Sequence, residues 1–153
     1  EVKGLMGFAE GEKHVVSPAE NISSVGMFER VGVVSQTTQN EEAFSSLVAG
    51  LVPKARELKV YNTICRATLD RQSAVRRLAA QTDCIIVLGG KNSENTGKLA
   101  ETAQCAGVPV MWIEQSEELD RGWLQNKETI GIAAGGSTPD WLIQQLISKL
   151  HSM

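Results

Sequence analysis

The chain has 153 residues, of which 42% are hydrophobic and 22% are charged, as is typical of a globular protein. The formal net charge is −3 and the sequence holds no basic block, which excludes nucleic-acid binding driven by counterion release. No apolar run approaches the roughly 20 residues that span a bilayer, and an odd number of cysteines without an export signal indicates a cytoplasmic protein with no membrane partner.

The first half of the chain alternates short, apolar, β-branched runs with stretches of helical periodicity. A capping-box spacing and a proline at a first helical position predict that a helix begins at Pro18. The other elements predicted here are strands at residues 13–16, 31–35 and 58–61 and helices at residues 40–55 and 71–80. This alternation of strands and helices indicates an α/β fold.

The second half repeats the alternation more clearly. Its predicted elements are strands at residues 84–88, 110–113 and 129–133 and helices at residues 94–106, 116–124 and 140–150. Short, continuously apolar strands between helices are typical of parallel sheets that are covered on both faces. We therefore predict two small parallel-sheet α/β lobes, with a boundary near Glu57 that separates residues 1–57 from residues 58–153.

Polar runs follow four of the predicted strands, where ligands of open α/β sheets bind. These runs are residues 35–38, 62–65, 89–96 and 133–139. Hydroxyls, amides and free backbone N–H groups at helix N-termini together form an anion site, to which Lys91 can add a flexible positive charge. The same residue types also cap helices in ordinary proteins. Capping and the binding of a phosphate or diphosphate therefore remain alternative interpretations.

The cysteines fall into two kinds of environment. Cys65 lies at one of the polar junctions, where a thiol can serve as a nucleophile or a metal ligand. Cys84 and Cys105 are interpreted as core thiols, because free cysteine is commonly buried. The sequence has no Cys-x-x-Cys pair and thus no self-contained zinc or cluster motif.

Other conspicuous residues are interpreted as structural or solvated. The histidines are isolated, the tryptophans are expected to pack in the core, and the acidic cluster is expected to form a solvated helix start that the helix dipole favours. These residues are His14 and His151, the tryptophans Trp112, Trp123 and Trp141, and the acids Glu114, Glu117, Glu118 and Asp120.

Several motifs occur in a fixed order over nearly the whole chain. They are residues 1–4 with 6–7, residues 35–38, residues 62–68 with Arg71-Gln72, residues 89–93 with 95–96, and residues 134–139. In order and spacing they resemble the hydroxymethylbutenyl diphosphate reductases, the LytB family. The resemblance implies the C-terminal two lobes of a three-lobed α/β protein, with the first lobe absent from this chain.

The resemblance also implies a function. Family members are iron–sulfur oxidoreductases of non-mevalonate isoprenoid synthesis, which convert hydroxymethylbutenyl diphosphate, an allylic diphosphate, to isopentenyl and dimethylallyl diphosphates. A 4Fe–4S or 3Fe–4S cluster with three cysteine ligands is expected in the full-length protein, with an electron donor such as ferredoxin or flavodoxin. Because one cysteine cannot hold a cluster, this chain alone is expected to lack it and to be inactive. The alternative is a non-catalytic phosphate- or diphosphate-binding module of the same fold.

The motifs assign roles to individual residues. Cys65 resembles the third cluster cysteine, and Thr37 resembles the threonine of the proton-relay network. Glu1 resembles the acid of the family's His-Pro-Glu-Val segment, which delivers a proton, so Glu1 and Thr37 are the expected catalytic residues. The expected diphosphate ligands are Ser93, Asn95 and Ser137.

Two positions depart from the family pattern. Glu94 stands where the family usually has serine or another small residue, and a carboxylate that faces a diphosphate repels it. We expect Glu94 to face solvent, because acids in a first turn suit the helix dipole; the alternative is a weaker or altered site. Gly136 replaces the usual alanine and is expected to be harmless.

Overall fold

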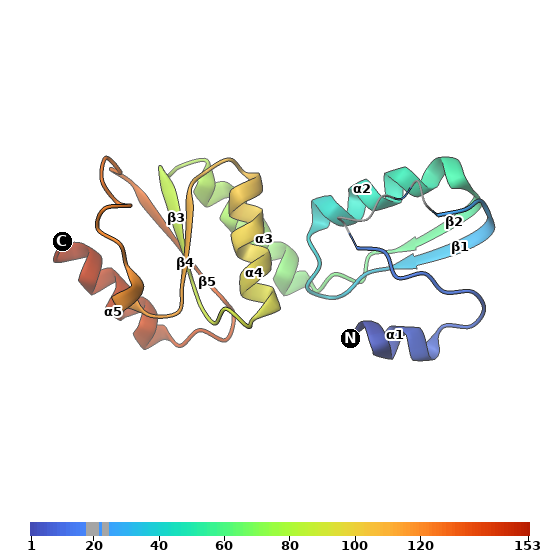
Figure 1. The fold of residues 1–153 in the computed structure, drawn as a ribbon, viewed down its shortest axis with the longest axis horizontal. Helices are drawn as coiled ribbons and strands as arrows, with labels where there is room; N and C mark the ends of the chain where they lie inside the picture. Colours follow the sequence, from blue (N-terminus) through green and yellow to red (C-terminus); the bar gives the residue numbers. More distant parts are fainter. Residues whose placement is uncertain (18–21, 23–24) are drawn as a thin grey trace. The chain divides into compact units, whose positions relative to one another are not determined.

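The computed structural model describes residues 1–17, 22 and 25–153, which form two compact units, Glu1–Arg66 and Ala67–Met153 (Figure 1). Each unit has its own parallel sheet, so the predicted α/β class with two small parallel sheets is confirmed. The boundary lies after Arg66, whereas the sequence placed it near Glu57. The reason is that Glu57 lies inside a strand that pairs with the first sheet.

The first unit is built on a two-stranded parallel sheet. Its elements are α1 (Val2–Phe8), β1 (Phe28–Val34), α2 (Glu41–Leu51), the 3-10 turn η2 (Val52–Lys54) and β2 (Ala55–Tyr61). The Asn40 side chain caps α2 by accepting a hydrogen bond from the Ala43 N–H at 3.0 Å. Phe44 and Leu51 of α2 are buried. Because β1 and β2 are parallel, the polar runs that follow them lie at the same edge of this sheet.

Several features of this unit differ from the expectations. Residues 13–16 form no strand, because a β-strand needs a hydrogen-bonded neighbour, and His14 is exposed, with its ring edge against Phe28 at 5.6 Å between centroids. Helix α1 was not predicted, since two glycines weaken its helical propensity. The helix at residues 40–55 ends at Leu51, because Pro53 has no N–H to donate. The helix start expected at Pro18 lies outside the described residues.

The second unit is a three-stranded parallel sheet between helices. Its elements are α3 (Arg66–Ala79), β3 (Cys84–Leu88), α4 (Glu94–Cys105), β4 (Val110–Ile113), the 3-10 turn η3 (Ser116–Glu118), β5 (Ile130–Ala134) and α5 (Asp140–His151). The strand order is β4-β3-β5, so β3 is central, and all its residues are buried. The predicted helix at residues 116–124 shrinks to the single 3-10 turn η3.

The central strand supplies the core on both faces of this sheet. Ile85 and Val87 pack in one cluster with residues of α3 and α4, whereas Ile86 and Leu88 pack in the other with Leu146 of α5. Successive side chains of a strand point to opposite faces, and Figure 1 shows α5 on the opposite side of the sheet from α3 and α4. The expected burial of Trp141 is wrong: its side chain is 64% exposed. None of the described helices combines the length and apolar character that crossing a membrane requires.

Gly131 in β5 is packed too closely for any side chain. A Cβ there would lie 2.8 Å from Cγ of Leu78 and 3.1 Å from Cγ1 of Ile85, both core atoms. Gly131→Ala is therefore expected to lower the free energy of unfolding of the second unit by roughly 1–3 kcal/mol, the usual cost of overpacking. Urea denaturation followed by tryptophan fluorescence measures this, because all three tryptophans lie in the second unit.

Gly90→Ala is the matched control, since a Cβ at position 90 meets only Oε1 of Glu114, at an ordinary 3.6 Å. Equal denaturation midpoints for the two variants would contradict the packing argument.

Candidate functional site

Glu1 and Thr37, the two residues predicted to be catalytic, are in direct contact in the first unit. The Thr37 backbone N–H donates to Oε1 of Glu1 at 3.0 Å, and the Thr37 hydroxyl donates to Oε2 at 3.1 Å. Glu1 immediately precedes α1, and Thr37 lies in the turn after β1. Both are exposed. The contact therefore forms a carboxylate–hydroxyl pair that is open to a ligand and able to carry a proton.

Cys65 is joined to the same turn. Its backbone N–H donates to the carbonyl oxygen of Thr37 at 2.9 Å, which fixes the start of α3 against the loop after β1. The two loops are linked again by Thr63, whose hydroxyl accepts from the Ser35 N–H at 2.9 Å and donates to the Ser35 carbonyl oxygen. Glu1, Thr37 and Cys65 thus gather at one edge of the β1–β2 sheet.

The thiols differ in their availability as metal ligands. Cys65 is exposed at the sheet edge, whereas Cys84 is buried, and burial raises the pKa of its thiol. Cys105 was expected in the core but is exposed, because it is the last residue of α4 and lies beyond that helix's buried stretch. Within the described ranges, no group of three or more His, Cys, Asp and Glu residues could hold a metal ion. Of the two exposed thiols, that of Cys65 lies beside the loop of Thr37, whereas that of Cys105 lies at the end of α4.

The second unit has a compact polar edge where β3 and β5 end. Gly89 adopts φ +147°, and a Cβ there would lie 2.9 Å from Oγ1 of Thr138 and 3.0 Å from Oγ1 of Thr96. A Cβ on Gly135 would collide with the same Thr96 hydroxyl. Both Gly135, through its N–H, and Thr138, through its hydroxyl, donate to the carbonyl oxygen of Leu88. Glycine at both strand ends thus lets the two loops meet around the first turn of α4.

The predicted diphosphate ligands belong to these loops. Ser93 is the N-cap of α4 and accepts from the Thr96 N–H at 3.3 Å, so the capping interpretation holds for this residue. Asn95 is half-buried in the first turn, and Ser137 is exposed in the turn before α5. Glu94 is exposed, as expected for a first-turn acid. The N-terminus of α4, with Ser93 and Asn95, and the turn that carries Ser137 therefore form a polar edge suited to an anion.

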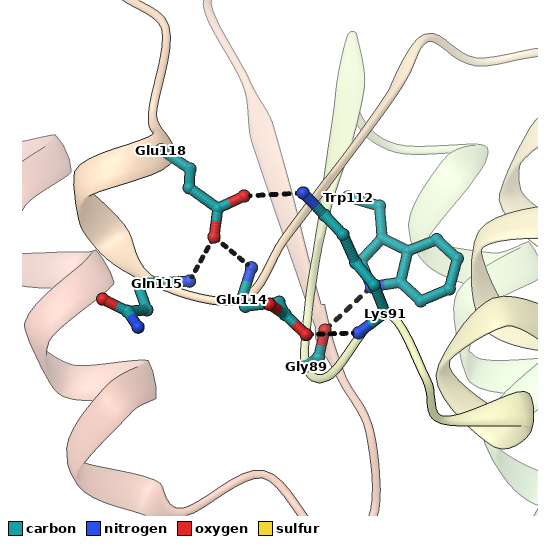
Figure 2. Close-up of polar contacts among 6 residues, drawn as sticks. All are labelled: Gly89, Lys91, Trp112, Glu114, Gln115 and Glu118. Atoms are coloured by element: carbon teal, nitrogen blue, oxygen red, sulfur yellow. Dashed lines mark hydrogen bonds and ion pairs between the residues drawn. The ribbon is translucent and has the colours of Figure 1, made fainter.

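Lys91 does not lie free beside this edge. Its Nζ forms a 2.9 Å ion pair with Oε2 of Glu118, and its backbone N–H donates to Oε1 of Glu114 at 2.6 Å (Figure 2). The hydrogen bond between the two side chains raises the pKa of Lys91 and lowers the pKa of Glu118. The charge that Lys91 was expected to add to the anion site is therefore neutralised locally.

The acidic cluster is thus more than the solvated helix start expected from sequence. Oε1 of Glu118 accepts from the N–H groups of Glu114 at 2.9 Å and Gln115 at 3.1 Å, closing a capping box that starts at Gln115 (Figure 2). Trp112 also does more than pack, because its Nε1–H donates to the carbonyl oxygen of Gly89 at 2.8 Å. The capping-box spacing of Gln115 and Glu118 could have been recognised in the sequence. The ion pair between Glu118 and Lys91 could not, because the two residues are far apart in the chain.

Glu118→Gln is expected to destabilise the second unit at neutral pH by up to about 1 kcal/mol, as is usual for exposed ion pairs. The pKa of Glu118 is lowered from 4.5, first by the Lys91 side chain and then by the Glu114 N–H. A lowered pKa in the folded state adds stability above pH 4.5 that is lost as the pH falls through the folded-state pKa. The difference between variant and parent should therefore shrink in acid.

Urea denaturation at pH 7 and pH 3 measures this effect, with Glu128→Gln as a control that removes an equal charge from an exposed residue of the same unit. A destabilisation that is the same at both pH values would show that the Glu118 carboxylate is not its cause.

The amino-acid sequence of the chain is similar to those of known proteins. The family profile described as LytB protein matches residues 1–151. The 4-hydroxy-3-methylbut-2-enyl diphosphate reductase of Geobacter sulfurreducens is 43% identical over 151 residues, which cover 99% of this chain and 54% of the relative. The protein of the same name from Aquifex aeolicus is 42% identical over 156 residues, which cover 100% and 54%. The chain thus spans about half the length of the curated relatives it matches.

Two solved structures are similar as well. The structure of an (E)-4-hydroxy-3-methyl-but-2-enyl diphosphate reductase, described as the terminal enzyme of the non-mevalonate pathway, matches with a TM-score of 0.57 and 45% identity, over 82% of this chain and 44% of that one. The E-1-hydroxy-2-methyl-but-2-enyl-4-diphosphate reductase of Plasmodium falciparum matches with a TM-score of 0.72 and 28% identity, over 79% and 39%.

Proposed function

The chain belongs to the LytB family, and from this premise we propose that it forms the C-terminal two lobes of a three-lobed 4-hydroxy-3-methylbut-2-enyl diphosphate reductase. In the proposed reaction two electrons and two protons enter, the allylic C–O bond breaks, a C–H bond forms and water leaves. The products are isopentenyl and dimethylallyl diphosphates. The observation that carries the proposal is the meeting of Glu1, Thr37 and Cys65 at one sheet edge, although they are far apart in sequence.

Cys65 is the proposed ligand of an iron–sulfur cluster. Its exposed thiol lies just beyond β2, and its backbone is anchored to Thr37. When bound, the cluster supplies electrons to the substrate, and a donor such as ferredoxin or flavodoxin renews them. The other ligands are proposed to come from a further lobe, because the described residues contain no group of three or more His, Cys, Asp and Glu side chains that could hold a metal ion. This chain alone is therefore proposed to be inactive.

Glu1 is the proposed proton donor, and Thr37 holds it in place. The N–H and the hydroxyl of Thr37 each bind one oxygen of the Glu1 carboxyl, so its orientation is set before a ligand arrives. A protonated Oε2 can pass its proton to the Thr37 hydroxyl or to a substrate oxygen, which is the general-acid step that loss of water needs. The fixed geometry supports catalysis because no reorientation is required.

The second unit is proposed to hold the diphosphate. Ser93, Asn95 and Ser137 present polar side chains at the carboxyl edge of the β4-β3-β5 sheet, beside the N–H groups that begin α4. The alternative function is a non-catalytic diphosphate-binding module. One observation favours it: the second unit has its own core and its own polar edge, and Cys65 belongs to neither.

Co-expression with the N-terminal part of the Geobacter sulfurreducens relative tests the proposal. The complex is purified without oxygen, and iron, sulfide and substrate turnover are measured per complex. A cluster with turnover supports the reductase. A complex that binds diphosphate but holds no cluster supports the binding module instead.

Ser137→Ala is expected to weaken diphosphate binding by about three- to tenfold, the usual effect of losing one hydrogen bond. Cluster content in the co-expressed complex should not change. Titration calorimetry with inorganic pyrophosphate measures the affinity, and Ser148→Ala, another exposed serine of the same unit, is the control. An affinity equal to that of the control would remove Ser137 from the site.

A further inference from the structure

The guanidinium group of Arg71 lies against the turn that carries Ser137. A Cβ on Gly136 would lie 2.9 Å from Nη2, 3.0 Å from Cζ and 3.5 Å from Nε of Arg71. Three atoms of the group thus occupy the space that a side chain at position 136 would need. Arg71 reaches this turn from α3, so its position depends on the fold of the second unit and not on sequence proximity.

The charge of Arg71 is available to a ligand. Its side chain is exposed, and its hydrogen bond within the described chain is a long one, 3.4 Å from Nη1 to the carbonyl oxygen of Ala67. No carboxylate of the described residues forms an ion pair with it. Lys91, in contrast, is paired with Glu118. Arg71 is therefore a cation at the polar edge of this unit whose charge is not already neutralised.

Guanidinium chemistry suits the anion expected here. The group stays charged at any physiological pH and offers a planar fork of N–H donors, which matches two oxygens of a phosphate. Ser137 adds a hydroxyl next to Gly136, and the exposed carboxylate of Glu94 adds a negative charge to the first turn of α4. A diphosphate bound at this edge needs a cation to offset both its own charge and that of Glu94.

We propose that Arg71 is a further ligand of the diphosphate, and that the lack of a side chain at Gly136 leaves room for its guanidinium group against the turn that carries Ser137. The inference rests on the proposed function, because it adds a residue to the same site. It also gives the glycine at position 136 an effect on ligand binding, whereas its replacement of the usual alanine was expected to be harmless. A methyl group there displaces the end of a flexible side chain, so the fold is kept while the guanidinium moves.

Calorimetric titration of the full chain with inorganic pyrophosphate tests the proposal. Arg71→Gln is expected to weaken binding about tenfold, as the loss of a charge-assisted hydrogen bond predicts. Arg71→Lys keeps the charge without the fork and should weaken binding about threefold. Gly136→Ala keeps Arg71 itself and should weaken binding severalfold. Circular dichroism and tryptophan fluorescence show whether each variant is folded.

Arg77→Gln is the matched control, since Arg77 is exposed on the same helix and its Nη1 donates to Oγ of Ser73 at 2.8 Å. It should change the affinity less than twofold. Equal affinities for the Arg71→Gln and Arg77→Gln variants would overturn the inference, and the proposed function would survive if Ser137→Ala still weakened binding. If pyrophosphate bound neither to the parent chain alone nor to its co-expressed complex, both the inference about Arg71 and the proposed function would be overturned.

Discussion

Cys65→Ser is expected to remove the iron–sulfur cluster from the co-expressed complex and to lower turnover at least roughly a hundredfold. Loss of an outer-shell partner of a metal ligand already costs 10- to 100-fold in affinity or activity, so loss of a ligand should cost no less. Among the described residues, no group of three or more His, Cys, Asp and Glu side chains could hold a metal ion in its place. Iron and sulfide per complex, measured beside turnover, separate cluster loss from simple inactivity.

Cys105→Ser is the control for this variant, because Cys105 is also exposed but lies at the end of α4 in the second unit. It should keep both cluster and turnover. The backbone bond from Cys65 to Thr37 survives either substitution, so a folded complex is expected in both cases. Full iron content in the Cys65→Ser complex would leave this thiol without a role and would favour the diphosphate-binding module.

Glu1→Gln should lower turnover by roughly 10²- to 10⁴-fold, the range that general acid catalysis contributes. The amide cannot release a proton, and its NH₂ group would face either the N–H or the hydroxyl of Thr37, both of which now donate to carboxylate oxygens. Cluster content should not change, because Glu1 lies beside Thr37 and is not the cysteine ligand. The measurement is the rate per cluster at saturating substrate.

Two variants of Thr37 separate positioning from proton transfer. Thr37→Ser keeps the hydroxyl and should retain most of the turnover, whereas Thr37→Val keeps the shape but loses the 3.1 Å hydrogen bond to Oε2 of Glu1. The valine variant should therefore fall toward the Glu1→Gln rate. If Glu1→Gln turned over at the parent rate with a full cluster, the assignment of Glu1 as proton donor would be wrong.

The elements with the clearest local patterns, all in the second unit, were predicted correctly from the sequence. The apolar run of β3 predicted a strand in a sheet covered on both faces, and β4 was placed at residues 110–113 without error, because both signals lie within a few consecutive residues. The helices α4 and α5 were likewise placed to within one residue at their ends. The short polar loops after the strands followed from the same pattern, since turn and capping residues are local features.

Whether a short run becomes a strand depends on a partner elsewhere in the chain. Residues 13–16 have the composition of a strand but no neighbouring strand to pair with, so they remain irregular. In contrast, β2 begins at Ala55, three residues before its predicted start, because Ala55 pairs with Phe28 of β1. Pairing, which is non-local, decided both outcomes.

The amino-acid sequence by itself determined the α/β class, most strands and helices, and the family motifs that single out Glu1, Thr37, Cys65 and Ser137. Only the tertiary structure decided which side chains meet: Glu1 with Thr37, Lys91 with Glu118, and Arg71 with the backbone at Gly136. The physical reason is one of range. Periodicity and capping are properties of neighbouring residues, whereas a side-chain contact exists only after folding brings distant segments within a few ångströms of each other.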